Sequence, residues 1–190
     1  ALGATQQGQG QALEAETAFR KAADLARTDP APSISLGTLL LRQGRWDEAA
    51  PPYEQAILAD ASQPAGYDAM GDMQRQRGEL AEARQSYEAA VAVAPTDVPS
   101  RGSLATLYVQ LGDVSAAERE LVSATLQTPG SAIAFDTLGD FYTSRGRWNE
   151  AEAAYLRSIA LPGNVVTGHV SLGNLYSLLG QPDNARLQYQ

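Results

Sequence analysis

The chain has 190 residues, a formal net charge of −8 and an isoelectric point near 4.6. This acidity argues against nucleic acid and anionic membrane surfaces as partners, because both need a basic protein surface. The absence of cysteine excludes disulfides and thiolate metal sites, but it leaves the cytoplasm and the periplasm equally open. No apolar run of about 18 residues is present, so direct insertion into a membrane is not expected. Lys21 is the only lysine among 14 basic residues, a bias that favours a GC-rich bacterial source.

Small residues recur at a fixed period along the whole chain. Glycines separated by 34 residues form one column, and an alanine follows each of them by five residues. A fixed period of this length predicts one supersecondary unit per repeat. The glycine column is Gly10, Gly44, Gly78, Gly112, Gly146 and Gly180, and the alanine column is Ala15, Ala49, Ala83, Ala117, Ala151 and Ala185.

The spacing predicts pairs of helices from one end of the chain to the other. A partial repeat over 1–29 should carry most of two helices, the second of them near 12–26. Complete hairpins should follow over 30–63, 64–97, 98–131 and 132–165, and a partial repeat should cover 166–190. First helices are expected near 31–43, 65–77, 99–111, 133–145 and 167–179. Second helices are expected near 47–60, 81–94, 115–127, 149–161 and 183–190. Because no internal linker is visible, residues 1–190 are predicted to form a single array.

Two kinds of glycine have different predicted roles. The column at Gly44 ends the first helix, where a left-handed residue is favoured. A second column, with Gly37 and Gly139 among its members, falls inside the first helix, where glycine costs about 0.5–1 kcal/mol relative to alanine. We expect close approach of the paired helix to offset this cost, with the column alanine facing the glycine. Pro51 and Pro52 lie early in a second helix, and they predict a kink or a late helix start.

An aromatic column completes the pattern with Phe19, Tyr53, Tyr87, Leu121, Tyr155 and Tyr189. The fullest repeat contains Phe135, Leu138-Gly139, Tyr142, Gly146, Trp148, Ala151 and Tyr155. This pattern resembles the tetratricopeptide repeat over essentially the whole chain. It departs from the family pattern where Ser33 and Arg101 replace the first aromatic residue and where Gln6 and Gln74 replace the first tyrosine. The resemblance implies an all-α fold, a right-handed superhelical α-solenoid of antiparallel helix hairpins.

The resemblance also implies that the first helices line a concave groove. The groove residues singled out for partner binding are Thr38, Arg42, Asp68, Asp72, Arg75, Thr106, Asp136, Asp140 and Asn174. Asp68 with Asp72, and Asp136 with Asp140, are each four residues apart and therefore share one helix face. One interpretation is an acidic groove that receives a peptide bearing Arg or Lys, with Thr106 and Asn174 bonding its backbone. The alternative is a solvated face on an acidic protein.

No catalytic, cofactor or metal site is predicted. Acid–base catalysis needs carboxyl groups with separated pKa values in a closed pocket, which an open groove does not provide. His169 is the only histidine and falls in a packed column. The leading function is therefore a protein–protein interaction scaffold, and two alternatives stay open. One is end-to-end self-association through apolar edges at Leu172, Leu175, Tyr176 and Tyr189. The other is a non-catalytic region of a larger enzyme or of a secretion or membrane machine.

Overall fold

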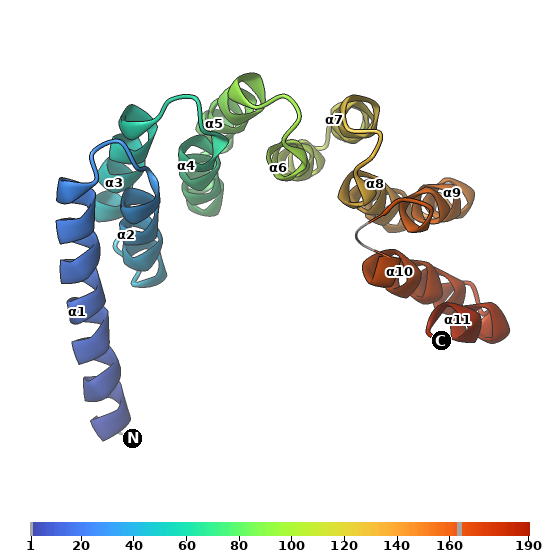
Figure 1. Ribbon diagram of the computed structural model, residues 1–190, viewed down its shortest axis with the longest axis horizontal. Helices are drawn as coiled ribbons and strands as arrows, with labels where there is room; N and C mark the ends of the chain where they lie inside the picture. The colour runs from blue at the N-terminus through green and yellow to red at the C-terminus, as the bar shows by residue number, and fades with distance from the viewer. Residues whose placement is uncertain (1, 163–164) are drawn as a thin grey trace. The chain divides into compact units, whose positions relative to one another are not determined.

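The computed structural model describes the backbone of residues 2–162 and 165–190, and all of its regular secondary structure there is helical (Figure 1). The chain divides into two compact units, Ala1–Pro95 and Thr96–Gln190. The helices of the first unit are α1 (Leu2–Leu25), α2 (Ala31–Arg42), α3 (Trp46–Ala59), α4 (Pro64–Arg77) and α5 (Leu80–Val93). Those of the second unit are α6 (Val98–Gln110), α7 (Val114–Gln127), α8 (Ala132–Ser144), α9 (Trp148–Ile159), α10 (Val165–Leu178) and α11 (Pro182–Gln188).

The predicted all-α repeat fold of helix hairpins is confirmed within each unit. α2 pairs with α3 and α4 with α5 in the first unit, while α6 pairs with α7, α8 with α9 and α10 with α11 in the second. Each second helix from α3 onward begins one residue before its predicted start. The prediction of one array over residues 1–190 remains a prediction.

The first repeat differs from the expectation of two helices within 1–29. α1 is one continuous helix, and Gly10 lies inside it instead of ending a helix. At the positions where Trp46 and Asp47 begin a new helix after Gly44, α1 has Ala12 and Leu13. Each glycine inside a helix costs about 1 kcal/mol relative to alanine. α1 contains Gly3, Gly8 and Gly10 and is nevertheless continuous.

The turn glycines have the predicted left-handed conformation. Gly44, Gly78, Gly112, Gly146 and Gly180 have φ values of 75°, 81°, 83°, 69° and 68°. The amide of each following residue donates to a carbonyl five positions back, for example Arg45 to Leu40 at 3.0 Å. This Schellman pattern satisfies carbonyl groups that the helix end would leave without a partner. It closes each hairpin so that the second helix runs back along the first.

In every hairpin except α6–α7, which has Ala105 in place of the glycine, a tyrosine ring and not an alanine covers the mid-helix glycine. A Cβ atom at Gly139 would lie 2.5 Å from Tyr155 Cε1, and one at Gly37 would lie 2.6 Å from Tyr53 Cε1. The same pairing joins Gly71 to Tyr87 and Gly173 to Tyr189. The expected glycine–alanine contact is therefore wrong as the reason for the glycine, because the ring fills the space that a side chain would need. The column alanines are still fully buried at Ala49, Ala83, Ala117 and Ala151.

Successive hairpins within a unit meet at small residues near the start of each first helix. A Cβ atom at Gly66 would lie 3.0 Å from Ile57 Cγ1, and one at Gly168 would lie 2.9 Å from Ile159 Cγ1. Ala134 is 1% exposed at the same register and packs with Ala124. These contacts bring each first helix against the preceding second helix.

The two prolines of α3 do not delay the helix. α3 begins at Trp46 and runs through Pro51 and Pro52, so the expected late start is wrong. Pro52 and the following Tyr53 are buried against the core of the hairpin, which includes Leu36 and Leu40. This packing offsets the amide hydrogen bonds that the two prolines cannot make.

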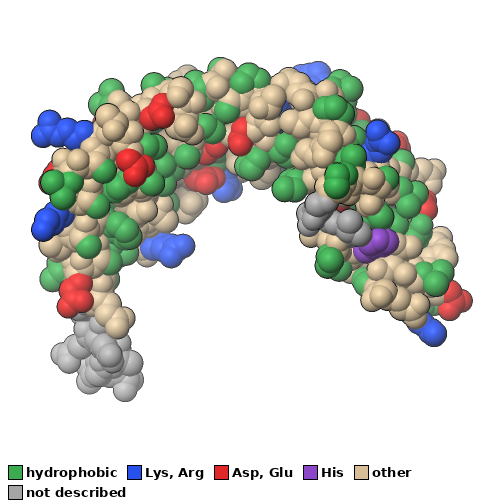
Figure 2. All heavy atoms as spheres, viewed as in Figure 1, with side chains coloured by type: hydrophobic (Ala, Val, Ile, Leu, Met, Phe, Trp, Pro, Cys, Tyr) green, Lys and Arg blue, Asp and Glu red, His purple; other side chains and the backbone are tan. Residues whose placement is uncertain are grey.

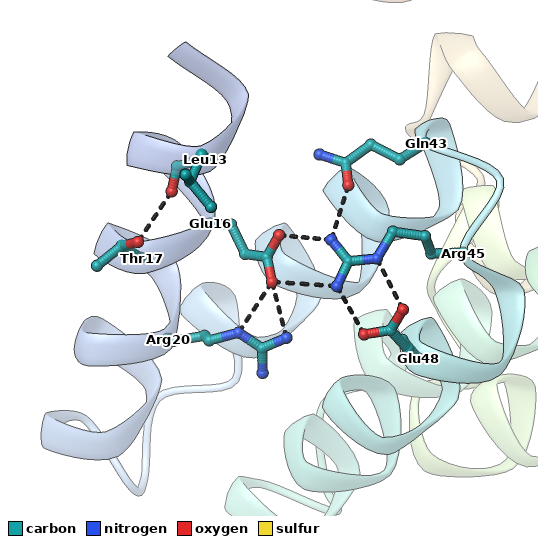
Figure 3. Close-up of polar contacts among 7 residues, drawn as sticks. All are labelled: Leu13, Glu16, Thr17, Arg20, Gln43, Arg45 and Glu48. Atoms are coloured by element: carbon teal, nitrogen blue, oxygen red, sulfur yellow. Dashed lines mark hydrogen bonds and ion pairs between the residues drawn. The ribbon is translucent and has the colours of Figure 1, made fainter. Parts of the chain in front are cut away.

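A charged cluster fastens α1 to the next hairpin (Figure 3). Glu16 on α1 accepts hydrogen bonds from Arg45, at 2.6 Å to its Oε2, and from Arg20, at 2.8 Å to its Oε1. Arg45 also bonds Glu48 at 2.6 Å and Gln43 at 2.9 Å. These bonds from Arg45 and then Arg20 lower the pKa of Glu16. α1 thus contacts the α2–α3 hairpin as a preceding second helix would.

Candidate functional site

Each unit has a hollow between consecutive first helices. The α2–α4 hollow encloses about 260 Å³ and the α6–α8 hollow about 270 Å³. The first is lined by Thr38, Leu41, Arg42, Tyr53, Ala69, Asp72 and Gln76. The second is lined by Gly102, Ala105, Thr106, Val109, Leu121, Thr137, Asp140, Phe141, Ser144 and Arg145. Thr38, Leu41 and Asp72 correspond to Thr106, Val109 and Asp140 two repeat periods later, so the two hollows are built from the same register.

Tyrosine hydroxyl groups orient the polar side chains of these hollows. Tyr87 donates to Asp72 Oδ1 at 2.6 Å, and Tyr155 donates to Asp140 Oδ1 at 2.7 Å. Tyr189 donates to Asn174 at 2.8 Å in the same way. The hydroxyl group of each tyrosine whose ring covers a glycine thus lies beside the residue that follows that glycine on the first helix. Because only Oδ1 receives this bond, Oδ2 of each carboxylate is available to another donor.

Burial and hydrogen bonding raise the tyrosine pKa values. The pKa of Tyr155 is raised by burial and by its bond to Asp140, although its contact with Thr143 opposes the rise. Burial, then the bond to Asp72, raises the pKa of Tyr87. Both hydroxyl groups therefore stay protonated at neutral pH and remain hydrogen-bond donors to the carboxylates.

Asp72 and Asp140 differ in their charged neighbours. Arg75 Nη2 lies 3.6 Å from Asp72 Oδ1, and Arg75 Nε donates to the Tyr87 hydroxyl at 3.3 Å. On α8, Thr143 replaces Arg75 at this register, and its hydroxyl lies 3.1 Å from that of Tyr155. No Arg or Lys nitrogen of a described residue lies within 4.0 Å of Asp140.

The other predicted groove residues divide into exposed and buried ones. Arg42, Thr106 and Asn174 are exposed, and Thr38 is half-buried with its hydroxyl 3.3 Å from that of Tyr53. Thr106 donates to the Gly102 carbonyl at 2.8 Å, because Leu121 replaces the tyrosine that would otherwise reach it. Acidic side chains lie scattered among apolar and uncharged ones on the face drawn in Figure 2.

Asp68 and Asp136 do not line the hollows beside their partners. Asp68 is half-buried, and Asp136 is only 6% exposed. Ser158 and Gly168 lie close to Asp136, because a Cβ atom at Gly168 would be 3.2 Å from Ser158 Oγ and 3.5 Å from Asp136 Oδ1. Burial raises the pKa of Asp136, Ser158 lowers it by hydrogen bonding, and Asp140 raises it by charge repulsion. Asp136 therefore faces the α8, α9 and α10 packing and not the surface.

Sequence reasoning missed the ion pairs that join hairpins. Arg147, which precedes α9, bonds Glu118 of α7 at 2.8 Å and Glu150 at 3.0 Å. Tyr142 also donates to Glu118 at 3.0 Å, and the Arg147 guanidinium carbon lies 4.3 Å from the Tyr142 ring centroid. The signal that could have found this cluster is the motif Gly-Arg-Trp-(Asp/Asn)-Glu, present at 44–48 and 146–150.

The described residues show neither a metal centre nor a membrane span. Within 2–162 and 165–190, no three Asp, Glu or His side chains gather where they could hold a metal ion. The helices of this described part lack the combination of length and apolar character that crossing a bilayer requires. His169 is half-buried on α10, and its Nδ1 lies 2.9 Å from Gln188 Oε1 on α11.

Solved structures with the same fold are similar to nearly the whole chain. YrrB, described as a TPR protein with an unusual peptide-binding site, is 20% identical with a TM-score of 0.54, and the match covers 90% of this chain and 88% of YrrB. TTC0263 from Thermus thermophilus is 24% identical with a TM-score of 0.62, over 84% of this chain and 88% of that protein. BtubC from P. vanneervenii is 18% identical with a TM-score of 0.69, over 95% and 87%. At these identities the similarity shows the fold.

Family models match most of the sequence. No curated protein matches it at a significant level. One tetratricopeptide repeat model matches residues 1–66 and again 34–98, a second matches 74–138, and a third matches 134–165. These matches agree with the hairpins, the turn glycines and the tyrosine–glycine contacts. The chain belongs to the tetratricopeptide repeat family.

Proposed function

We propose that the chain is an interaction scaffold that binds a peptide segment of a partner protein on its first-helix faces. The observation that carries this proposal is the pair of register-equivalent hollows between first helices. Each contains a carboxylate fixed by a tyrosine hydroxyl, Asp72 or Asp140, above an apolar floor. Oriented polar groups over a preformed apolar surface are typical of recognition sites.

Polar residues of the first helices have capacity left for a peptide backbone. Asn174 uses its carbonyl oxygen for Tyr189, so its amide nitrogen remains available to donate. The Thr106 hydroxyl donates to Gly102 and still offers lone pairs to a peptide N–H group. An extended segment could therefore bond the first helices without displacing their existing contacts. The peptide-binding site ascribed to YrrB, a protein of the same fold, agrees with this proposal.

We further propose that the preferred segments carry basic residues. The chain has a net charge of −8, and its two hollows place carboxylates at the surface. Electrostatic complementarity increases association rates and suppresses partners of like charge. We propose no catalytic role for these faces, because nothing encloses the two carboxylates against water.

Selection from a random peptide display library on the immobilised full chain tests the proposal. Affinities of the selected peptides would then be measured by fluorescence anisotropy for variants that fill each hollow, Thr38→Trp and Thr106→Trp. Filling a hollow should weaken its peptides by about tenfold or more, as loss of a central contact does at other interfaces.

Leu58→Ser and Leu126→Ser provide matched controls on second helices. These leucines are 86% and 75% exposed on α3 and α7, so their replacement should leave the fold and the affinity unchanged. If the leucine variants lost binding while the tryptophan variants kept it, the binding surface would be the second helices. That result would reject the proposal.

A second candidate function is self-association through the α10–α11 hairpin. Leu172 and Leu175, predicted as open apolar edges, are instead buried at 0% and 1% exposed, so other residues of the hairpin would have to form the contact. A hollow of about 420 Å³ there is lined by apolar residues that include Val166, Val170 and Leu187, which are 77%, 44% and 66% exposed. Exposed apolar side chains grouped around a hollow are typical of interaction surfaces. Sedimentation velocity over a hundredfold range of concentration should detect dimers that Val170→Glu abolishes. A sedimentation coefficient that is independent of concentration would exclude this candidate.

A further inference from the structure

The two hollows share one register but differ in the arginines around their carboxylates. Arg75 follows Asp72 by three residues on α4, and Thr143 follows Asp140 by three residues on α8. Residues three apart on a helix are neighbours, so this position decides what lies beside the carboxylate. The α2–α4 carboxylate therefore has an arginine beside it where the α6–α8 carboxylate has a threonine.

In the α2–α4 hollow the carboxylate already has a cation. Arg75 Nη2 lies 3.6 Å from Asp72 Oδ1, while Arg75 Nε donates to Tyr87, which itself donates to Asp72. Arg42 lines the same hollow and adds a second positive charge. An incoming ammonium or guanidinium group would meet two arginines around one carboxylate, which is an unfavourable arrangement of charge.

In the α6–α8 hollow the carboxylate lacks such a cation. Thr143 stands in place of Arg75, and Gln110 stands at the register of Arg42. Arg145 lines the hollow, but its guanidinium carbon lies 5.8 Å from the Phe141 ring centroid, and it forms no ion pair with Asp140 within 4.0 Å. Asp140 keeps its negative charge exposed beside an apolar floor.

That floor suits the stem of a long basic side chain. Ala105, Leu121 and Phe141 are 2%, 3% and 7% exposed and form the base of the hollow with Val109. Lysine and arginine side chains place their methylene groups against apolar surfaces while their charged ends stay in contact with water or a carboxylate. The hollow therefore offers an apolar floor to the methylene groups of such a side chain and the Asp140 carboxylate to its charged end.

Resting on the proposed function, we propose that the α6–α8 hollow is the subsite for a lysine or arginine side chain of the partner. Its cationic end pairs with Asp140 and its stem lies against Val109 and Leu121. The α2–α4 hollow does not bind this side chain, because Arg75 replaces Thr143 there and already pairs with Asp72. The residue at this equivalent position, Arg75 on α4 or Thr143 on α8, thus determines which charge each hollow prefers.

Paired peptides test the proposal on the full chain. Each peptide selected by display would be synthesised with its arginines replaced one at a time by citrulline, the neutral isostere, and with each lysine replaced by acetyl-lysine. For the wild-type chain, neutralising one particular basic residue of the peptide should lower the affinity about fivefold, as expected for loss of a partly exposed ion pair. Asp140→Asn and Thr143→Arg should remove this discrimination while binding of the neutral peptide persists.

Asp72→Asn is the matched control, because it removes a carboxylate that Arg75 already compensates. It should leave the discrimination intact, and circular dichroism would confirm that all variants keep their helix content. If Asp72→Asn removed the discrimination and Asp140→Asn did not, the assignment would be overturned. Peptides that bind the wild-type chain without discriminating arginine from citrulline would overturn the subsite and leave the scaffold function standing. A wild-type chain that selects no peptide would overturn both.

Discussion

The Tyr155 ring lies over Gly139 while its hydroxyl donates to Asp140, so one side chain packs the hairpin and orients a surface carboxylate. Tyr87 does the same for Gly71 and Asp72. A buried hydroxyl that bonds a carboxylate makes a stronger hydrogen bond than one that bonds a neutral group. Stability and the geometry of the candidate site are therefore linked at single residues.

Tyr155→Phe should lower the free energy of unfolding by about 1–2 kcal/mol, because it removes a bond to a charged acceptor and leaves the ring in place. Tyr53→Phe is the comparison, since its hydroxyl lies 3.3 Å from neutral Thr38 and should contribute less. Urea unfolding followed by circular dichroism would measure both. Equal losses in the two variants would show that the carboxylate bond adds nothing beyond an ordinary polar contact.

Asp136→Asn should stabilise the chain at neutral pH. The raised pKa means that the folded chain holds this proton more tightly than the unfolded chain, so ionisation of Asp136 costs stability as the pH rises above the ordinary value of 3.8. The gain from Asn should therefore be present at pH 7 and shrink as the pH falls toward that value. Unfolding curves at several pH values would measure it, and a variant less stable than wild type at pH 7 would contradict the account.

At the scale of elements, a glycine in the first helix pairs with a tyrosine in the second in every hairpin except α6–α7. Where the first helix has Ala105 in place of glycine, the second helix has Leu121 in place of tyrosine. A branched aliphatic side chain leaves room for the methyl group that a phenol ring excludes. The substitution at both positions keeps the two helices packed, since Ala105 and Leu121 are 2% and 3% exposed.

Gly139→Ala should therefore destabilise the chain by about 1–3 kcal/mol through overpacking. The second change Tyr155→Leu should restore part of that loss, because it recreates the pair present in α6 and α7. Gly102→Ala is the control, since a Cβ atom there would meet only Thr137 Cγ2 at 3.9 Å. It should stabilise by about 0.5–1 kcal/mol. Additive losses at 139 and 155 in a double-mutant cycle would refute the steric explanation.

The ion pairs between hairpins should control local opening. Arg147→Gln removes the bonds to Glu118 and Glu150, so amides near the α8–α9 turn should exchange faster with solvent while α10 and α11 change little. Arg45→Gln should act in the same way between α1 and α2. Hydrogen exchange read by mass spectrometry would compare the variants, and unchanged protection at both turns would show that these bonds do not hold the hairpins together.

The sequence was sufficient for the elements because turn glycines and period-34 columns fix where each helix begins and ends. The sequence pattern was not sufficient at α1. Gly10 belongs to the glycine column, but no second helix begins after it. The site was predicted only in part. Asp72 and Asp140 line the hollows between first helices, while their role in partner binding stays a prediction. The burial of Asp136 depends on Ser158 and Gly168, which lie distant along the chain. Such packing is not encoded in the helical register alone.

At the scale of the whole molecule, the net charge of −8 adds a long-range attraction for basic segments. Peptides selected on the chain should bind more weakly as the salt concentration rises. At 0.1 M ionic strength, dissolved ions largely screen the attraction between exposed charges that are more than about 10 Å apart. Titrations from 50 to 500 mM NaCl would measure this dependence. The citrulline forms of the same peptides should show a shallower slope, and identical slopes would indicate that the basic side chain makes no charged contact.

Methyl and amide NMR spectra of the full chain, recorded while a selected peptide is added, test most directly that the first-helix faces bind the partner. The account predicts shift changes concentrated at Thr38 and Leu41 in one unit and at Thr106, Val109 and Thr137 in the other, with little change at exposed Leu58 and Leu126. Changes confined to the second helices α3, α5, α7 and α9 would contradict it.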